Sequence, residues 1–309
     1  MVMKNLTAAS EFILLGLSTS PHLQVFLFLV FFVIYIITLL GNAVIMLVVH
    51  NDPHLHTPMY FFLGNLSFID ICYSSVIVPN MLHTFLVERK TISLSGCITQ
   101  IFFFLFFATV EGLVLTAMAY DRYVAICHPL HYTAIMKRWV HIQLASGAWV
   151  TAFFYSLTNT LLITDLHFCR PSLINHFSCE PPQLFKISCS DPFTNQLVIF
   201  TVGATLWGTA FLITLSSYVL IISAVLRLHS VERKHKAFST CSSHLTVIFM
   251  YYVPILFRYL KPTTHTSQDQ EKLISVVYLI ITPMLNPIIY SLRNQEVKKA
   301  LGNFFRRTG

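Results

Sequence analysis

The sequence has 309 residues, of which 55% are hydrophobic and only 11% are charged, with a formal net charge of +7. Soluble domains carry about 25% charged residues, so this composition excludes an ordinary soluble domain and indicates a membrane protein. In such a chain the excess of Lys and Arg reports membrane topology, and it does not indicate a nucleic-acid-binding protein.

The apolar residues form blocks, each long enough for a helix that crosses a bilayer, which needs about 20 residues. Membrane-spanning β-strands would give alternating segments of about 10 residues, whereas these blocks are longer and apolar on nearly every face. No internal repeat of the kind found in transporters is visible. The sequence therefore predicts an all-α membrane protein, a bundle of seven transmembrane helices near 23–48, 58–82, 98–120, 140–162, 196–226, 238–260 and 272–291.

The distribution of Lys and Arg predicts the orientation of this bundle. An N-terminus outside the cell places twelve of the 20 Lys and Arg residues in the cytoplasm, which the positive-inside rule favours. "NLT" at Asn5 is a glycosylation sequon, which is used only if this end faces the lumen. "EFILLGLS" lacks the basic start and the cleavage site of a signal peptide, so we expect an ordered tail. We expect one domain over 1–309, with an extracellular tail (1–22), the bundle (23–291) and a cytoplasmic tail (292–309).

Two carboxylates lie inside predicted membrane helices, Asp70 in the second and Glu111 at a comparable depth in the third. Phe104, Ala108, Glu111 and Leu115 recur on one face of the third helix. A charge at bilayer depth costs at least about 2.5–3.5 kcal/mol, so both acids should face the bundle interior. Two facing carboxylates repel, so either one takes up a proton or a small cation such as Na⁺ lies between them. The alternative is a purely structural hydrogen-bond network with one protonated acid.

The third predicted helix carries a second pair of charges, Asp121 and Arg122, about 15 Å beyond Glu111. They lie at the cytoplasmic mouth of the bundle, where adjacent charges can pair and partly hydrate. They serve either as interfacial anchors or as a latch on the third helix. Further along the chain, Pro254 and Pro283 interrupt the backbone hydrogen bonds of the sixth and seventh helices, so kinks are expected there.

The seven cysteines divide between the two sides of the predicted bundle. Those of the outer half and its loops are an even set, which in an oxidising compartment indicates two disulfides with three possible connectivities. This set is Cys97, Cys169, Cys179 and Cys189. The other three, Cys72, Cys127 and Cys241, are expected to be free thiols.

Five segments of the chain are distinctive in their order and spacing. They are "LHTPMYFFLGNLSFID" (55–70), "MAYDRYVAICHPLHY" (118–132), "SY" (217–218), "KAFSTCSSHL" (236–245) and "PMLNPIIYSLRN" (283–294). Together they resemble the odorant receptors, a branch of the rhodopsin-like G-protein-coupled receptors, in the form of the tetrapod-type class. The resemblance runs from "EFILLGLS" to the end of the seventh helix, and it implies a short amphipathic helix on the inner leaflet at "QEVKKALGNFFRR".

This resemblance implies a role for each group of polar residues. Arg122 would insert toward the G protein when the sixth helix moves outward, and Asp121 would restrain it at rest. The complete activation set that the family implies is Asp121, Arg122, Tyr123, Tyr218, His244 and Tyr290. Asp70, Glu111 and Asn286 would form the ion or proton pocket. The implied disulfides are Cys97–Cys179 and Cys169–Cys189.

The family pattern also implies a ligand pocket above Glu111, between the third, fifth, sixth and seventh helices. Its candidate wall residues are Phe104, Leu105, Ala108, Thr109, Gly112, Val202, Leu206, Tyr252, Ile255, Tyr259, Ser275, Val276 and Leu279. Nearly all are apolar, with Thr109, Ser275 and two tyrosine hydroxyls as polar groups, so the expected ligand is a small, mostly apolar, uncharged volatile molecule. For each of these residues, plain helix packing is the alternative to ligand contact.

The resemblance thus implies an odorant receptor in the plasma membrane, expected in the cilia of olfactory sensory neurons, that activates a stimulatory olfactory-type G protein and raises cAMP. Membrane lipids and trafficking helper proteins are further expected partners, and no cofactor is expected beyond the Na⁺ alternative. The nearest alternative is a rhodopsin-like receptor for a non-odorant ligand outside the olfactory epithelium. A transporter or channel would give the cytoplasmic "DRY" no role, and the sequence contains no HExxH or GxSxG motif of an enzyme.

Overall fold

The computed structural model describes residues 11–308 except 19, 169–172, 228–229 and 261–267. Within its helices, the side chains of 231–233, 235–240, 258–260, 293, 305 and 307–308 are not described.

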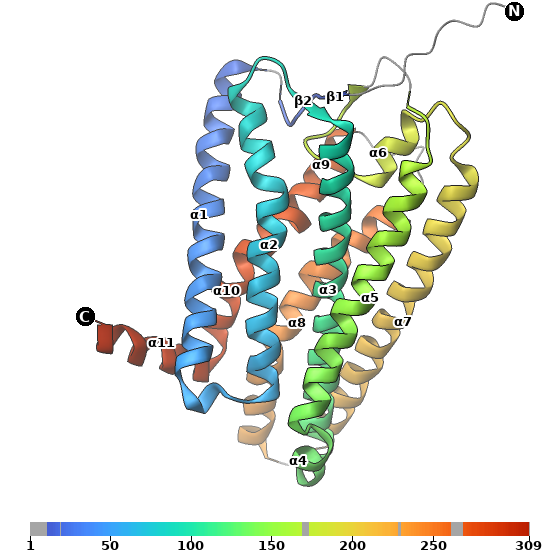
Figure 1. The fold of residues 1–309 in the computed structure, drawn as a ribbon. Helices are drawn as coiled ribbons and strands as arrows, with labels where there is room; N and C mark the ends of the chain where they lie inside the picture. Colours follow the sequence, from blue (N-terminus) through green and yellow to red (C-terminus); the bar gives the residue numbers. More distant parts are fainter. Residues whose placement is uncertain (1–10, 19, 169–172, 228–229, 261–267, 309) are drawn as a thin grey trace, which may run out of the picture.

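Seven long helical segments in the described part of the chain form one bundle (Figure 1). They are α1 (Pro21–Asn51), α2 (Pro58–Leu86), α3 (Leu94–Cys127), α5 (Arg138–Thr164), α7 (Phe193–Leu226), α8 (Val231–Leu260) and a composite of α9 (Gln268–Val276), the π-helix η3 (Val277–Ile281) and α10 (Thr282–Arg293). Each predicted span falls within one of them, so the predicted architecture is confirmed. Among the described residues, five are long and apolar enough to cross a membrane: α1, α2, α3, α7 and α9–η3–α10. In α8 the apolar stretch is shorter, Cys241–Phe257.

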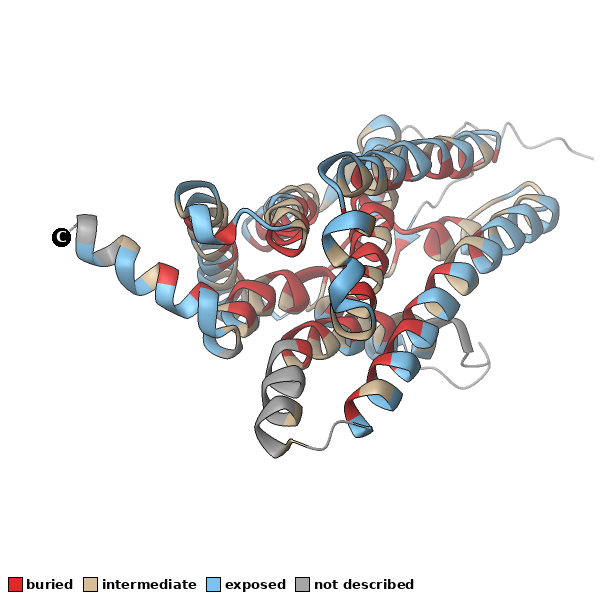
Figure 2. Ribbon diagram, turned by 90° about the horizontal axis from the view of Figure 1, so that it is seen from below, coloured by how far each residue is buried: buried red, intermediate tan, exposed pale blue. Residues whose placement is uncertain are grey.

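Helix α3 lies at the centre of the bundle and contacts α2, α5, α7 and α8. Half of its residues are buried, including the two acids Glu111 and Asp121. Seen from below, the buried faces of the helices turn toward one another and the exposed faces turn outward (Figure 2). The side chains of α3 therefore connect both ends of the bundle.

A small sheet covers one end of the bundle, which we call the sheet end. Strand β1 (Glu11–Leu14) lies between β2 (Thr91–Ser93), to which it is antiparallel, and β3 (Leu173–Ile174), to which it is parallel. Phe12 and Leu14 alternate with exposed neighbours and are fully buried in a second apolar cluster with Ile101 and Ile163. A short helix, α6 (Pro181–Lys186), completes this end. We expected an ordered tail here; its strand was not predicted.

The opposite end, which we call the α11 end, carries the short helices η1 (Pro53–Leu55), η2 (Pro129–His131) and α4 (Tyr132–Ile135), and α11 (Gln295–Thr308). Helix α11 runs away from the bundle (Figures 1 and 2). Tyr60 holds its start by donating from the phenol oxygen to Asn294 Oδ1 (3.2 Å) and Glu296 Oε2 (2.8 Å). The predicted helix after the bundle is confirmed.

The seventh segment contains an irregularity that the sequence did not predict as such. Pro283 has no N–H to donate, and the turn before it is the π-helix η3 rather than an α-helical turn. Thr282 Oγ1 donates to the Val277 carbonyl at 3.1 Å, and Asn42 Nδ2 donates to the Pro283 carbonyl at 3.0 Å. The side chains thus satisfy backbone groups at the interruption. Helix α8 continues through Pro254.

Candidate functional site

Two buried acids lie at the middle of the bundle, Asp70 on α2 and Glu111 on α3. Asn286 Nδ2 donates to both carboxylate oxygens of Asp70, at 3.1 and 2.9 Å. Glu111 lies close enough to Asp70 for the two charges to repel. Glu111 Oε1, Asn286 Oδ1 and the Tyr290 hydroxyl are buried without a hydrogen-bond partner in the described part of the chain. Unsatisfied acceptor oxygens fit an added proton or a hard cation such as Na⁺.

The structure thus brings the three predicted members of the ion or proton pocket together around one polar core. Their role in holding an ion or proton stays a prediction. Among the described residues, no group of three or more His, Cys, Asp and Glu side chains could hold a metal ion.

The second pair of charges lies toward the α11 end. Asp121 is buried, and its Oδ2 lies 4.0 Å from Arg122 Nε, at the limit of an ion pair. Asp121 Oδ1 accepts a shorter hydrogen bond, 2.8 Å, from the Tyr132 hydroxyl on α4. Tyr123, the next residue of the motif, contacts His128 Nε2 through its hydroxyl at 3.1 Å. Asp121 is therefore held more closely by Tyr132 than by Arg122.

Tyr132 was not singled out in the sequence, although it closes the segment "HPLHY". Burial, with the Asp121 carboxylate beside it, raises the pKa of the Tyr132 phenol. The phenol therefore stays protonated, and able to donate, throughout the physiological pH range. The signal that could have revealed it is a tyrosine eleven residues after the buried Asp121, in a segment too polar to cross a membrane.

The remaining members of the predicted activation set separate into two places. Tyr218 on α7 and His244 on α8 meet through a 2.6 Å hydrogen bond between the hydroxyl and Nδ1, and both side chains are buried. Tyr290 on α10 is equally buried, but its hydroxyl has no hydrogen-bond partner among the described residues. The Tyr218–His244 hydrogen bond therefore joins α7 to α8 directly, whereas Tyr290 lies near Asp70 and Glu111.

The predicted ligand-pocket residues differ in their exposure. Phe104, Thr109, Gly112, Tyr252, Ser275 and Leu279 are buried, whereas Leu105, Ala108, Leu206, Ile255 and Val276 are half-buried. The side chain of Tyr259 lies outside the described residues. Val202 exposes 41% of its surface, and its predicted place in the pocket wall stays a prediction. The inward face of α7 begins one residue later, at Gly203, and continues through Ala210 and Thr214.

Three helices meet at Gly112. A Cβ atom placed on it would clash with the Trp207 ring of α7 and lie 2.7 Å from the Tyr251 hydroxyl of α8. Tyr251 also donates from its hydroxyl to the Ala108 carbonyl at 2.7 Å. Trp207 and Tyr251 were missed in the sequence. Trp207 lies one turn after Gly203, so the helical period of the inward face would have found it.

A loop segment closes the site from the sheet end. Cys97 at the start of α3 is bonded to Cys179, as predicted, and Gln100 Oε1 accepts from the Cys179 N–H at 2.9 Å. Glu180 Oε2 accepts from the Tyr278 hydroxyl at 3.0 Å, and that hydroxyl lies 3.3 Å from Ser275 Oγ. The Ser275 hydroxyl thus already has a hydrogen-bond partner, the Tyr278 hydroxyl.

The other cysteine and glycosylation predictions reach residues that are not described. Cys189 is disulfide-bonded, but Cys169 lies outside the described residues, and so does Asn5. The pairing of Cys169 with Cys189 stays a prediction. Cys72, Cys127 and Cys241 are free, as expected.

The buried acids, the Asp121–Arg122 pair and the Cys97–Cys179 disulfide are now all placed in the bundle, and the whole chain can be compared with known proteins. A family profile described as "Olfactory receptor" matches residues 31–307. The chain belongs to the olfactory receptor family. It is 47% identical to human Olfactory receptor 5F1, over 99% of this chain and 98% of that protein. It is 49% identical to human Olfactory receptor 5A1, over 98% of this chain and 96% of that protein.

Among solved structures, the olfactory receptor described here resembles squid rhodopsin, with a TM-score of 0.69 over 94% of this chain and 87% of that one. At 16% identity this likeness shows the fold alone, a seven-helix rhodopsin-like bundle. Family and fold together make the chain a G-protein-coupled receptor of the plasma membrane, with a small-molecule ligand and a G protein as partners. It is a receptor and not an enzyme.

Proposed function

We propose that this olfactory receptor binds a small, mostly apolar, uncharged volatile molecule between α3, α7, α8 and α9, on the sheet-end side of Glu111. Binding would activate a stimulatory olfactory-type G protein and raise cAMP. The observation that carries this proposal is the meeting of α3, α7 and α8 at Gly112, beside the rings of Trp207 and Tyr251. The close packing at Gly112 leaves no room for a ligand at that point, so the proposed ligand lies beside it, toward the sheet end. A ligand there that shifts Trp207 or Tyr251 alters the contact of all three helices, so its binding energy depends on how they pack.

The polar groups near Gly112 limit what the ligand can be. Thr109 Oγ1 is buried and has no hydrogen-bond partner among the described residues, so it is ready to donate to a ligand oxygen. The Tyr252 hydroxyl lies 3.5 Å from Thr116 Oγ1, a weak contact that a ligand could replace. Helix α7 contains no Asp, Glu, Lys, Arg or His. One or two hydrogen bonds in an otherwise apolar wall suit an aldehyde, ketone, ester or alcohol.

The same helices offer a route from the ligand to the G-protein end. Tyr251 and His244 are seven residues apart on α8, about 10 Å along the same helix face. A ligand that displaces Tyr251 therefore moves the partner of Tyr218, and with it the contact of α7 with α8. We propose that loosening of this contact lets α8 move and frees Arg122 for the G protein.

We further propose that Asp70 and Glu111 share a proton or a Na⁺ ion in the resting receptor. The unpartnered oxygens of Glu111 and Asn286 support this, since neither has another described donor to satisfy it. The sheet end would face outside the cell, and the α11 end would face the cytoplasm and the G protein. Ciliary location and dependence on trafficking helper proteins remain proposals that rest on the family.

The test is a cAMP assay in cells that express this receptor with the olfactory stimulatory G protein, across chemically varied volatiles. Arg122→Ala, matched for surface level, serves as the uncoupled control. We expect a dose-dependent rise for neutral, mostly apolar molecules that vanishes in the control. Activation by charged, non-volatile ligands alone would overturn the proposed ligand class. A response that persists in Arg122→Ala would overturn the proposed coupling.

A further inference from the structure

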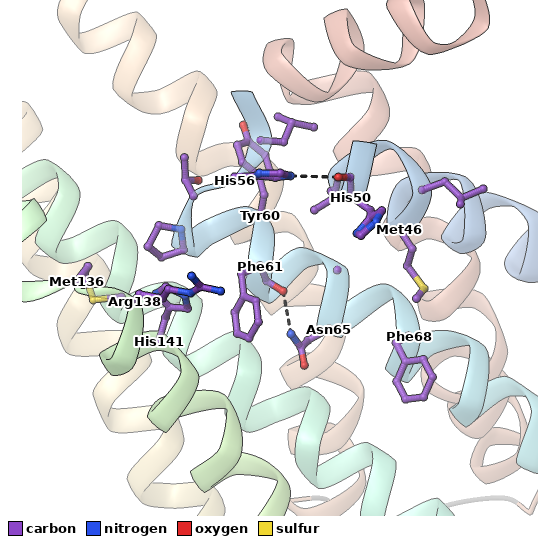
Figure 3. Close-up of a pocket in the computed structure, with 16 residues that line it drawn as sticks. Met46, His50, His56, Tyr60, Phe61, Asn65, Phe68, Met136, Arg138 and His141 are labelled. Atoms are coloured by element: carbon purple, nitrogen blue, oxygen red, sulfur yellow. Dashed lines mark hydrogen bonds between the residues drawn. The ribbon is translucent and has the colours of Figure 1, made fainter. Parts of the chain in front are cut away.

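A groove on the outside of the bundle lies apart from the proposed ligand site, and His141 in its wall lies near Asp121. It is a cavity of about 980 Å³ between α1, α2 and α5, close to the α11 end (Figure 3). Known small-molecule sites have volumes of about 300–1,000 Å³, so this groove is large enough for a substantial ligand. Nothing in the olfactory function described above uses it.

The groove is polar at one end and apolar along its length. At the polar end lie His50, His56, Arg138 and His141. Along α2, the lining runs from Thr57 to Phe68, about 16 Å at the rise of an α-helix. Met46 and Leu47 on α1 and Phe68 on α2 are among its apolar lining residues. A ligand that fills it must combine a polar head with a long apolar chain.

The charge at the polar end has one sign. None of the residues that line the groove is an Asp or a Glu. Arg138 is exposed and takes part in no salt bridge among the described residues, and Figure 3 shows it on the α5 side, near Phe61. The His141 ring lies 4.9 Å from the Phe61 ring, beneath this guanidinium. The head that fits here is an anion.

Gly64 forms part of the groove wall on α2. A Cβ atom on Gly64 would meet only Val49 Cγ1, at 3.9 Å, which is ordinary contact. The glycine is therefore not required by close packing between α1 and α2, and a larger side chain at this position would extend into the groove. This offers a way to fill the groove without disturbing the helices that form it.

We propose that this groove is a binding site for one anionic glycerophospholipid of the surrounding leaflet, with its phosphate at Arg138 and an acyl chain along Phe61, Gly64 and Phe68. Basic pockets between membrane helices at this level are suited to anionic head groups. The groove opens on the lipid-facing surface, where Leu47 and Phe68 are 50% and 44% exposed. A phospholipid already lies in the plane of the membrane at this depth and needs no route from water.

The test uses the full-length receptor in nanodiscs of phosphatidylcholine with a minority of phosphatidylserine that carries a photoreactive acyl chain. After illumination, labelled peptides are mapped by mass spectrometry. We expect labelling of the α1 and α2 segments that line the groove, stronger than with the same photoreactive chain on phosphatidylcholine. Arg138→Gln should reduce labelling about fivefold, the effect of one interfacial cation near an anionic head. Gly64→Leu should abolish it.

Lys298→Gln is the matched control, since it removes an exposed cation from α11, at the same end of the receptor but outside the groove. It should leave groove labelling unchanged. Equal losses in Arg138→Gln and Lys298→Gln would show diffuse surface attraction and overturn the site. Equal labelling by both lipids, or displacement of the label by sterol alone, would overturn the anionic phospholipid as occupant. Melting temperatures of all variants show whether each is folded, and none of these readouts depends on signalling.

Discussion

The Tyr132 hydroxyl lies 2.8 Å from Asp121 Oδ1, whereas Arg122 Nε lies 4.0 Å from the other oxygen of the same carboxylate. One acid thus has two partners from different elements, the tyrosine on α4 and the arginine beside it on α3. Because the hydrogen bond from Tyr132 fixes the carboxylate and draws negative charge toward one oxygen, it weakens the attraction of the other oxygen for Arg122, so the two partners compete. The position of α4 therefore bears on how freely Arg122 can move.

We expect Tyr132→Phe to weaken signalling. Without the phenol, Asp121 loses a hydrogen bond to a charged group, which is worth about 1.5–3 kcal/mol, and turns to Arg122 instead. A more tightly held Arg122 should lower ligand potency about tenfold in the cAMP assay at equal surface level. Tyr35→Phe, which removes the hydroxyl bonded to Ser75 at the outer face of the bundle, is the control. Higher basal cAMP in Tyr132→Phe would contradict this competition.

The same bond should be insensitive to pH near neutrality. Because burial raises the pKa of Tyr132, its contribution is complete below the ordinary tyrosine value of about 10 and is lost only as the pH rises above it. The potency difference between the wild-type receptor and Tyr132→Phe should be constant between about pH 6 and 8. We would measure it in membranes with a nucleotide-exchange assay. A potency difference that changes between about pH 6 and 8 would show that another titrating group controls this hydrogen bond.

Asn286 Nδ2 donates to both carboxylate oxygens of Asp70 in the wild type. Asp70→Asn replaces one of these oxygens by an amide N–H₂, so two donors face each other, and we expect a loss of stability of about 1–3 kcal/mol. The measurement is the melting temperature in detergent. The double variant Asp70→Asn/Asn286→Asp again contains one amide and one carboxylate and should recover most of the loss. An Asp70→Asn single variant that melts like the wild type would show that this contact contributes little.

Glu111→Gln addresses the proposed ion or proton. It keeps the shape of the side chain and removes its charge, so a Na⁺ effect on basal signalling should disappear while the fold is retained. We would titrate NaCl against choline chloride at constant ionic strength and record nucleotide exchange. If neither the wild type nor the variant responds to Na⁺ but their pH profiles differ, the acids share a proton. If both salt and pH profiles coincide, the pair is only structural.

Gly112→Leu should prevent normal packing of α3 against α7, since even a Cβ atom on Gly112 clashes with Trp207. Overpacking of this kind costs about 1–3 kcal/mol. We expect a lower melting temperature and loss of the ligand response, with partial recovery of stability in Gly112→Leu/Trp207→Leu. Gly147→Leu on α5, where a Cβ meets nothing within 4 Å, is the control. Similar melting of both leucine variants would contradict the assigned contact.

Cys97→Ser should remove the bond that ties the start of α3 to the segment before α6. It closes a loop of 82 residues, for which chain entropy predicts a loss of about 4.5 kcal/mol. We expect little receptor at the cell surface and a strongly lowered melting temperature in what is recovered. Cys72→Ser, at a free and half-buried thiol, should behave like the wild type. A stable Cys97→Ser receptor would contradict the structural role of this bridge.

The apolar blocks predicted all seven helices, because bilayer thickness imposes a length that soluble folds lack, although only five of the described segments are apolar over a full membrane-spanning length. The buried acids were equally visible, since a charge in an apolar run has few explanations. What could not be predicted depends on contacts between distant segments. Strand β1 has too few residues to identify itself and exists because β2 and β3 pair with it. The helical period places Trp207 on the inward face of α7, but it does not reveal that Trp207 touches Gly112. Tyr132 lies outside the long helices, so no period points to its contact with Asp121.

The central place of β1 in its sheet has a consequence for synthesis. Glu11 pairs with Ser93, and Ile13 pairs with Leu173, so the first strand to leave the ribosome needs partners made about 80 and 160 residues later. Until α3 and then the segment after α5 have been inserted, Phe12 and Leu14 have no apolar cluster to join. For much of its translation, the nascent chain therefore carries a strand with unpaired backbone groups and exposed apolar side chains. Chaperones and quality-control factors recognise segments of this kind.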